Sequence, residues 1–235
     1  MFHKGKFAQS MVEVTSQKKL VGQILTISVI SLIIGMSIWC WEDVLEDRLI
    51  PKRFGAVEAG AIYRSGRLSS ALVKKTLEKH QIKVIVSLTA ENPDNPDERA
   101  QLAAAKKLGI EIKRFPLRGN GTGDVDCYVG AVEVIVNARK EGKPVLVCCA
   151  SGTQRTGGVT ACYRLLVENR TPEFVYKEMK QYGWKPHKNS VLVDYINENL
   201  PAIAVYLKNK GILKKVPDPL PRLPVSGRQK NDGQD

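Results

Sequence analysis

A chain of 235 residues provides one folded domain with extensions, and its 43% content of hydrophobic residues excludes wholesale disorder. The net charge of +12 favours an anionic partner, but the basic residues are scattered and are not interleaved with aromatic ones, so nucleic-acid binding is not expected. The five cysteines follow no repeated spacing and the three histidines are dispersed, which excludes a disulfide framework and a zinc site.

The first predicted element is an apolar helix over residues 20–41. Its run VGQILTISVISLIIGMSIWC carries no charge and is long enough to cross the hydrocarbon layer of a membrane. Trp39 and Trp41 suit the membrane interface. A cleaved signal peptide is the main alternative, but the run is long for one and no small-x-small cleavage site follows it. A buried core helix is the other alternative, and such helices rarely lack charge altogether. We therefore expect an uncleaved transmembrane anchor.

The charges beside this span predict its orientation. Four lysines precede it, and a cluster of four acidic residues follows it between positions 42 and 47. Three later basic residues weaken this asymmetry: Arg48, Lys52 and Arg53. The positive-inside rule places residues 1–19 in the cytoplasm and the remainder of the protein outside it. The expectation is a single-pass membrane protein with an extracytoplasmic folded domain.

From about residue 50, hydrophobic patterns predict alternating strands and helices. Strands are expected at 61–63, 83–88, 111–117 and 144–147, and helices at 69–80, 97–108, 128–139, 156–167, 172–182 and 191–207. This alternation predicts an α/β fold with a central, mainly parallel sheet flanked by helices, preceded by the transmembrane helix. Such sheets bind ligands at the carboxyl ends of their strands. The tail, residues 213–235, is rich in proline and polar residues and is predicted to be disordered.

The stretch PVLVCCASGTQRTGGVTACY, residues 144–163, combines a strand, a loop of small polar residues and a helix. Cys149 and Arg155 are separated by five residues, and Gly152, Thr156 and Gly157 accompany them. A bare Cys-x5-Arg pattern is weak, but in this strand-loop-helix context it becomes specific.

The chemistry of this loop follows from its residue types. A tight loop at a helix N-terminus directs backbone N–H groups into one concavity, which binds a phosphate dianion. The same positive potential favours the thiolate of Cys149, a nucleophile that can attack phosphorus. Arg155 suits a bidentate grip on two phosphoryl oxygens, and Thr156 can donate a hydrogen bond to the sulfur. The candidate substrate-binding residues are Ala150, Ser151, Gly152, Thr153, Gln154 and Arg155.

The loop CASGTQRTG resembles the signature loop of the cysteine-dependent protein tyrosine phosphatase superfamily, in particular its compact dual-specificity branch. IYRSGRLSS and VIVSL are similar to the first strands of the bacterial and plant-like dual-specificity phosphatases. The resemblance covers residues 61–195 and implies a phosphatase domain over residues 50–212. It also implies a two-step hydrolysis through a phosphocysteine, with Cys149 as nucleophile, Arg155 as phosphate ligand and Thr156 as the hydroxyl residue. No metal or organic cofactor is implied.

Cys148 departs from the pattern of this family, which has a histidine before the nucleophile that helps to lower the pKa of the thiol. The absence of this histidine predicts less efficient catalysis. Cys148 is interpreted as a small buried strand residue. A redox role is disfavoured, because a disulfide between adjacent cysteines strains the intervening peptide bond.

The family takes its general acid from an aspartate on a mobile loop, and RGNGTGDVD, residues 118–126, is the candidate loop. Asp124 is the first choice and Asp126 the second. Either can instead cap the helix that follows, and Asn120 can occupy the position of a lost acid.

The predicted function is hydrolysis of phosphomonoesters, with phosphotyrosine in proteins as the first candidate substrate and phosphoserine and phosphothreonine as further ones. A phosphate-binding pseudophosphatase is the alternative. A sulfur-transfer or arsenate-reducing enzyme explains Thr156 less well and lacks an evident resolving cysteine. The segment ASGTQ contains no lysine, which favours a monophosphate ester in a protein or small molecule over a highly charged inositol phosphate.

Overall fold

The computed structural model describes residues 23, 25–37 and 49–225. The chain divides into two units, residues 1–47 and 48–235, which are described separately. The second unit contains the predicted domain over residues 50–212. Its elements in chain order are β1 (Gly55–Glu58), β2 (Ile62–Ser65), α3 (Val73–Lys79), β3 (Val84–Ser87), α4 (Pro96–Leu108), β4 (Glu111–Arg114), α5 (Val125–Lys140), β5 (Val145–Cys148), α6 (Gln154–Leu166), α7 (Pro172–Gln181) and α8 (Val191–Asn209).

The five strands form one sheet in the order β1-β2-β5-β3-β4. β5 pairs in parallel with β2 and β3, and β3 pairs in parallel with β4. Only the edge strand β1 is antiparallel, to β2. The prediction of an α/β fold with a mainly parallel sheet flanked by helices is therefore confirmed, and the sheet is mixed because of β1.

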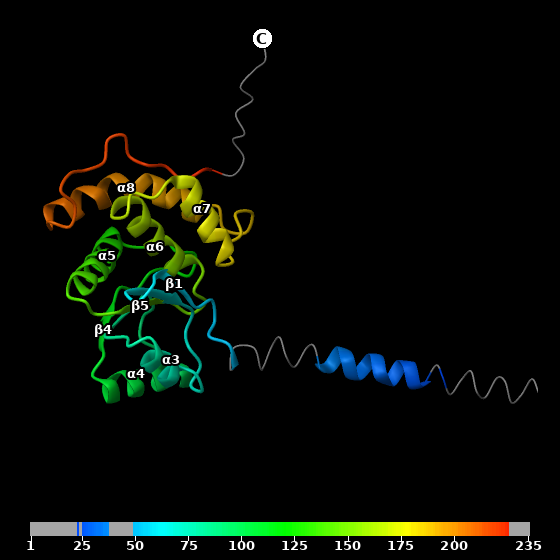
Figure 1. Cartoon of the computed structure of the whole chain (residues 1–235). Coiled ribbons are helices and arrows are strands. Elements are labelled where there is room, and N and C mark those ends of the chain that lie inside the picture. Colours follow the sequence, from blue (N-terminus) through cyan, green and yellow to red (C-terminus); the bar gives the residue numbers. More distant parts are fainter. Residues whose placement is uncertain (1–22, 24, 38–48, 226–235) are drawn as a thin grey trace, which may run out of the picture. The chain divides into compact units, whose positions relative to one another are not determined.

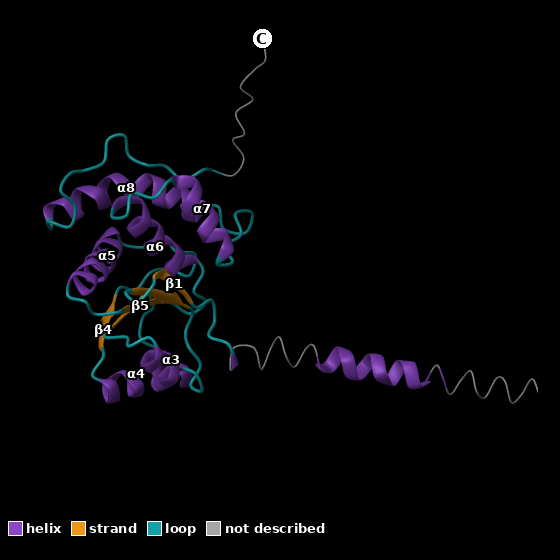
Figure 2. Ribbon diagram, in the orientation of Figure 1, coloured by secondary structure: helices purple, strands orange, loops and turns teal. Residues whose placement is uncertain are grey.

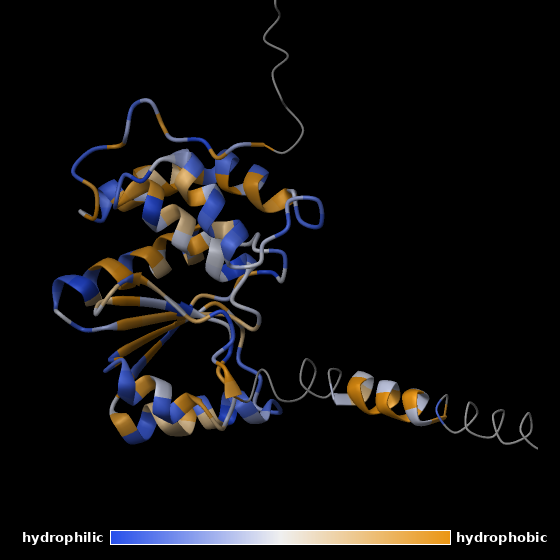
Figure 3. Cartoon of the chain, turned by 45° about the vertical axis from the view of Figure 1, so that its right-hand side comes forward, coloured by the Kyte–Doolittle hydropathy of each residue, from blue (hydrophilic) through white to orange (hydrophobic). Residues whose placement is uncertain are grey.

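Helices cover both faces of the sheet (Figures 1 and 2). α3 and α4 lie on one face, where Leu77 and Ala105 pack with Ile85 and Leu146 of the central strands. α5 and α6 lie on the other face, with α7 and α8 beyond them (Figure 1). Side chains of β2, β3 and β5 alternate between the two cores, and β3 and β5 are mostly apolar (Figure 3).

Local signals set several of the helix boundaries. Asn95 accepts a hydrogen bond from the amide of Glu98 at the start of α4, and Gly109 ends this helix at a φ of 64°. The helix expected at 69–80 is shorter, residues 73–79, and the strand expected at 111–117 ends at residue 114. The helix expected at 128–139 is longer and begins at Val125, because Asp124 caps it.

The tail predicted to be disordered is described as far as residue 225, and this part instead packs against the domain. The backbone amide of Leu223 donates to the Asn197 side-chain oxygen at 2.8 Å, and its carbonyl accepts from the Asn197 side-chain nitrogen at 3.0 Å. The Leu223 side chain is buried in the core beside α8. One asparagine on α8 therefore orders a segment whose composition is typical of disorder, and residues 226–235 lie outside the described residues.

In the first unit, residues 25–37 form a helix whose apolar side chains are exposed by 51% to 68% (Figure 3). Among the residues described, no helix combines the length and the apolar character needed to cross a membrane. The predicted span over residues 20–41 lies partly outside the described residues, as do residues 1–19.

Candidate active site

Cys149 lies directly after β5, the strand that has β2 and β3 on either side of it. All three strands run in the same direction, so Cys149 lies at their common carboxyl edge. The loop from Cys149 to Thr153 leads into α6, which begins at Gln154. The structure therefore brings together, on one short loop and the helix turn after it, the predicted nucleophile, the predicted phosphate ligand Arg155 and Thr156.

Gly152 is the residue that allows this loop to turn so tightly. Its φ of 77° is one that side chains other than glycine rarely adopt, and a Cβ at this position would overlap the backbone of Ser65 and Gly66. Glycine is thus required both by the dihedral angle and by the close approach of the segment after β2.

Three consecutive carbonyl groups of the loop are held by donors from three arginines. The amide of Arg67 donates to Ala150 at 3.1 Å, the guanidinium of Arg53 to Ser151 at 2.8 Å, and that of Arg64 to Gly152 at 2.8 Å. In a trans peptide the C=O and N–H groups point in opposite directions. Because these three carbonyl oxygens point toward the arginines, the N–H groups of the same peptides, those of Ser151, Gly152 and Thr153, point to the opposite side of the loop.

One of these amides reaches the candidate nucleophile, since Gly152 N–H donates to Cys149 Sγ at 3.1 Å. Burial raises the pKa of the Cys149 thiol, but the hydroxyl and amide of Thr156, the amide of Gly152 and the charge of Arg155 outweigh it. The net effect holds the pKa below the usual cysteine value, which favours the thiolate.

Arg155 and Thr156 both have unused hydrogen-bonding capacity. The half-buried guanidinium of Arg155 makes no hydrogen bond or ion pair with any described residue. The hydroxyl of Thr156 is buried and has no hydrogen-bond partner of ordinary geometry among the described groups, yet it lies close enough to Cys149 to lower the pKa of the thiol. Arg155 can thus bind an anion, and Thr156 can donate to the sulfur.

Cys148 belongs to the opposite face of the sheet from Cys149. It packs in the core with α3 and α4, whereas Cys149 packs in the core with α5 and α6. Burial raises the pKa of Cys148 to about 12, although a hydrogen bond from Gln101 opposes this effect. The interpretation of Cys148 as a small buried strand residue agrees with this environment, and its thiol is poorly suited to nucleophilic attack.

The loop over residues 118–124 lies beside the start of α6. A Cβ at Gly121 would come within 3.2 Å of the carbonyl oxygen of Gln154. Asn120 shapes this loop, because its side-chain oxygen accepts from both the amide and the hydroxyl of Thr122. The candidate acid loop is therefore adjacent to the signature loop.

Asp124 caps α5, as the alternative interpretation expected. One of its carboxylate oxygens accepts from the amide of Asp126 at 3.0 Å, and both side chains are exposed. The second oxygen of Asp124 accepts no hydrogen bond from any described residue. A capping role and a proton-donating role therefore use different atoms of this residue.

Three arginines that precede the signature loop in the chain differ in their surroundings. Arg118 is exposed, but Arg64 is fully buried and Arg67 forms an ion pair with the buried Glu98 at 2.9 Å. Sequence reasoning missed the role of Arg64 and Arg53 in binding the loop carbonyls. The signal available was the position of Arg64 inside a short apolar strand, where an arginine requires buried partners.

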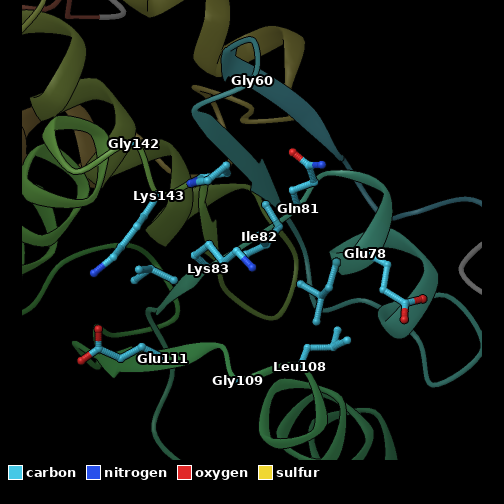
Figure 4. Close-up of a pocket in the computed structure, with 13 residues that line it drawn as sticks. Gly60, Glu78, Gln81, Ile82, Lys83, Leu108, Gly109, Glu111, Gly142 and Lys143 are labelled. Carbon is cyan, nitrogen blue, oxygen red and sulfur yellow. The ribbon is translucent and has the colours of Figure 1, made fainter.

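A cavity of about 920 Å³ opens at the other edge of the sheet, near the amino ends of β3 and β5 (Figure 4). Its charged lining residues are Glu78, Lys83, Glu111 and Lys143. None of its lining residues belongs to the signature loop, so this cavity is separate from the candidate active site.

The family model described as the tyrosine phosphatase family matches residues 48–219 of the chain. Among curated proteins, the "Putative tyrosine-protein phosphatase OCA1" of Yarrowia lipolytica is 32% identical over 121 residues, which are 49% of this chain and 45% of that protein. The dual specificity protein phosphatase TpbA of Pseudomonas aeruginosa is 28% identical over 123 residues, 52% of this chain and 51% of that protein. The chain thus spans about half the length of these curated relatives.

A crystal structure of Pseudomonas aeruginosa TpbA shares the fold. It matches with a TM-score of 0.55 and 21% sequence identity, over 67% of this chain and 92% of that chain.

Proposed function

The chain belongs to the tyrosine phosphatase family, and on this basis we propose that it hydrolyses phosphomonoesters through a phosphocysteine at Cys149. The observation that carries the proposal is the environment of this sulfur: it accepts an amide hydrogen bond from Gly152 and has a lowered pKa. The name of TpbA, a dual specificity protein phosphatase, supports phosphotyrosine in proteins as first substrate and phosphoserine or phosphothreonine as further ones.

In the first step, the thiolate of Cys149 attacks phosphorus, the S–P bond forms, and the P–O bond to the leaving group breaks. Arg155 and the inward amides of the loop bind the three non-bridging phosphoryl oxygens. In the second step, water attacks phosphorus and the sulfur leaves as a thiolate. The hydroxyl of Thr156 stabilises that leaving sulfur with a hydrogen bond, which is the use of its free donor.

The leaving group oxygen needs a proton, and Asp124 is the acid that we propose. Asp124 lies at the end of the loop that passes beside Gln154. The carboxylate oxygen that does not accept the Asp126 amide is available to carry the proton. After donating its proton in the first step, the same carboxylate accepts one from the attacking water in the second.

A pseudophosphatase that binds phosphate without turnover is the second candidate. The specific observation in its favour is the exposed, helix-capping Asp124 together with Cys148 in place of the histidine of the family. An aryl phosphate separates the two candidates, because its leaving group departs with little need for an acid. Turnover of p-nitrophenyl phosphate supports the enzyme, whereas phosphate binding without turnover supports the pseudophosphatase.

We also propose that residues 20–41 anchor the protein in a membrane, with residues 1–19 in the cytoplasm and the folded domain outside. The uncharged sequence of this span and the lysines before it support the proposal. A reporter fused after Asp235 is expected to behave as an exported protein. Cytoplasmic behaviour of the reporter would show that this orientation, or the insertion itself, is wrong.

The experiment that tests the proposed activity is phosphate release from phosphotyrosine peptides by the full chain. Release by the wild type and none by Cys149→Ser is the expected result. Equal release by both proteins would contradict the assignment of Cys149, and no release by either, on peptides and aryl phosphate alike, would contradict the phosphatase function.

A further inference from the structure

Arg64 on β2 is a charged side chain with no exposed surface. Its guanidinium donates to the Gly152 carbonyl at 2.8 Å and to the Thr160 hydroxyl at 3.3 Å. The ring of Tyr182 covers the guanidinium, with its centroid 3.8 Å from the central carbon. Its Nε is buried and has no hydrogen-bond partner among the described groups.

No carboxylate forms an ion pair with Arg64 within the described structure, which is unusual for a buried arginine. Arg164 on α6 shows the contrast, since it is also buried but pairs with Glu168 at 2.6 Å and Glu178 at 2.7 Å. Burial lowers the pKa of Arg64 to about 10, although electrostatic interactions with Glu178, Tyr182 and Cys149 oppose this effect. Arg64 thus has no carboxylate in direct contact within the described structure, and Glu178, which is paired with Arg164, acts on it only through its charge.

The hydrogen bonds of Arg64 connect the loop from Cys149 to Thr153 with the first turns of α6. Its bond to Gly152 fixes the peptide whose N–H belongs to Thr153. Its bond to Thr160 reaches Thr156, because the Thr160 hydroxyl donates to the Thr156 carbonyl at 2.8 Å. After Glu178 and Tyr182, the thiol of Cys149 is the next group with which its charge interacts.

We propose that Arg64 is a positioning residue for phosphoryl transfer, whose buried charge stabilises the Cys149 thiolate and the bound phosphoryl group. It holds the Gly152 carbonyl and supplies a second positive charge near Cys149, in addition to that of Arg155. Because no carboxylate pairs directly with Arg64 in the described structure, its charge remains available to the anions of the site. This inference rests on the proposed function of Cys149.

The test compares Arg64→Gln, which keeps a donor without charge, with Arg64→Lys, which keeps the charge. Arg164→Gln is the matched control, since it removes a buried arginine that lies on the same domain and has its own carboxylates. Three quantities are measured on the full chain: the pH midpoint of Cys149 alkylation by iodoacetamide, located by mass spectrometry, the Kd for vanadate, and kcat/KM for p-nitrophenyl phosphate. Thermal unfolding shows that each variant is folded.

For Arg64→Gln we expect the alkylation midpoint to rise by about one pH unit, which is a tenfold loss of thiolate below it. Vanadate affinity and kcat/KM should fall by about 10- to 100-fold, somewhat less than for loss of a direct oxyanion donor. Arg64→Lys should keep the midpoint near that of the wild type, and Arg164→Gln should change midpoint and affinity much less than Arg64→Gln. A folded Arg64→Gln protein with an unchanged midpoint and vanadate affinity would overturn the proposal.

A substitute variant and measurements that do not need turnover complete the test. If Arg64→Gln does not fold, Tyr182→Ala replaces it, because removal of the ring opens the guanidinium to solvent screening and should raise the midpoint in the same direction. An unchanged midpoint in Tyr182→Ala would then overturn the proposal. Alkylation and vanadate binding need no turnover, so they test Arg64 even if the wild type hydrolyses no ester and the proposed function fails.

Discussion

Gly152→Ala is the substitution for which the structure gives the clearest expectation. Two costs combine at this position, and only one of them arises at Gly211. Both glycines have a similar φ, 77° and 71°, so an alanine at either position costs about 1–2 kcal/mol in the left-handed region. At Gly211 a Cβ meets no atom within 4 Å, whereas at Gly152 it would overlap backbone atoms of Ser65 and Gly66.

The overlap at Gly152 involves backbone rather than a flexible side chain, so the loop or β2 must move. Overpacking of this kind costs about 1–3 kcal/mol. We therefore expect Gly152→Ala to lose about 2 kcal/mol more than Gly211→Ala. For a domain of this size that difference lowers the Tm by about 4–8 °C.

The assay is thermal unfolding of the full chain with and without inorganic phosphate. A ligand that binds only the folded state raises the Tm, and a displaced loop loses that increase. The expected result is a phosphate-dependent increase in the wild type and in Gly211→Ala, and none in Gly152→Ala. Equal Tm losses in both variants, with the phosphate effect retained in both, would refute the reasoning from close packing.

Three other outcomes are expected. Asp124→Asn should lower turnover of phosphotyrosine peptides by about 10²- to 10⁴-fold and turnover of p-nitrophenyl phosphate much less, because Asn removes the acid but preserves the helix cap. Equal effects on both substrates, or a larger effect in Asp126→Asn, would argue against Asp124 as the acid. Asn197→Ala should lower the free energy of unfolding by about 1–3 kcal/mol and expose residues 213–225 to proteolysis, because the amide and carbonyl of Leu223 lose their hydrogen-bond partners. Unchanged stability would contradict the role of Asn197 in ordering the tail. The pKa of Cys149 is lower in the folded state than in the unfolded state, so the thiolate stabilises the fold above the unfolded pKa, and this stabilisation is lost as the pH falls through the folded pKa. The Tm difference between the wild type and Cys149→Ser should therefore grow with pH. A constant difference would contradict the lowered pKa.

The arrangement of the sheet could be predicted because its central strands are buried on both faces and read as continuous apolar runs. VIVS and VLVC are such runs, and each is followed by a polar loop. β1 could not be predicted in the same way. Its sequence, Gly55–Glu58, is short and half-buried, and it becomes a strand only because β2 offers an unpaired edge.

The candidate nucleophile and its loop were also accessible from sequence, because their chemistry depends on local spacing. Cys149, Gly152 and Arg155 act within one turn between a strand and a helix. Asp124 was left open between acid and cap, and the structure shows the cap while leaving an oxygen free. Spacing along the chain does not distinguish two roles that use two oxygens of one carboxylate.

The contribution of Arg64 required the fold. Most arginines in proteins are exposed to solvent. The residues that contact Arg64, which are Gly152, Thr160 and Tyr182, are distant from it in the sequence. These residues lie about 90 to 120 positions away and meet it only when β2 pairs with β5. The same is true of Asn197 and Leu223, which order part of a tail whose composition predicts disorder.

The most direct test of the proposed function is identification of the covalent intermediate. The wild type is mixed with p-nitrophenyl phosphate, quenched in acid during turnover, digested, and analysed by tandem mass spectrometry of the peptide that contains both adjacent cysteines. We predict a phosphoryl group on Cys149, which has the lowered pKa, and none on Cys148, whose pKa is about 12. Cys148→Ser should retain this adduct and Cys149→Ser should lose it. A phosphoryl group on Cys148, or turnover that survives in Cys149→Ser, would contradict the proposed mechanism.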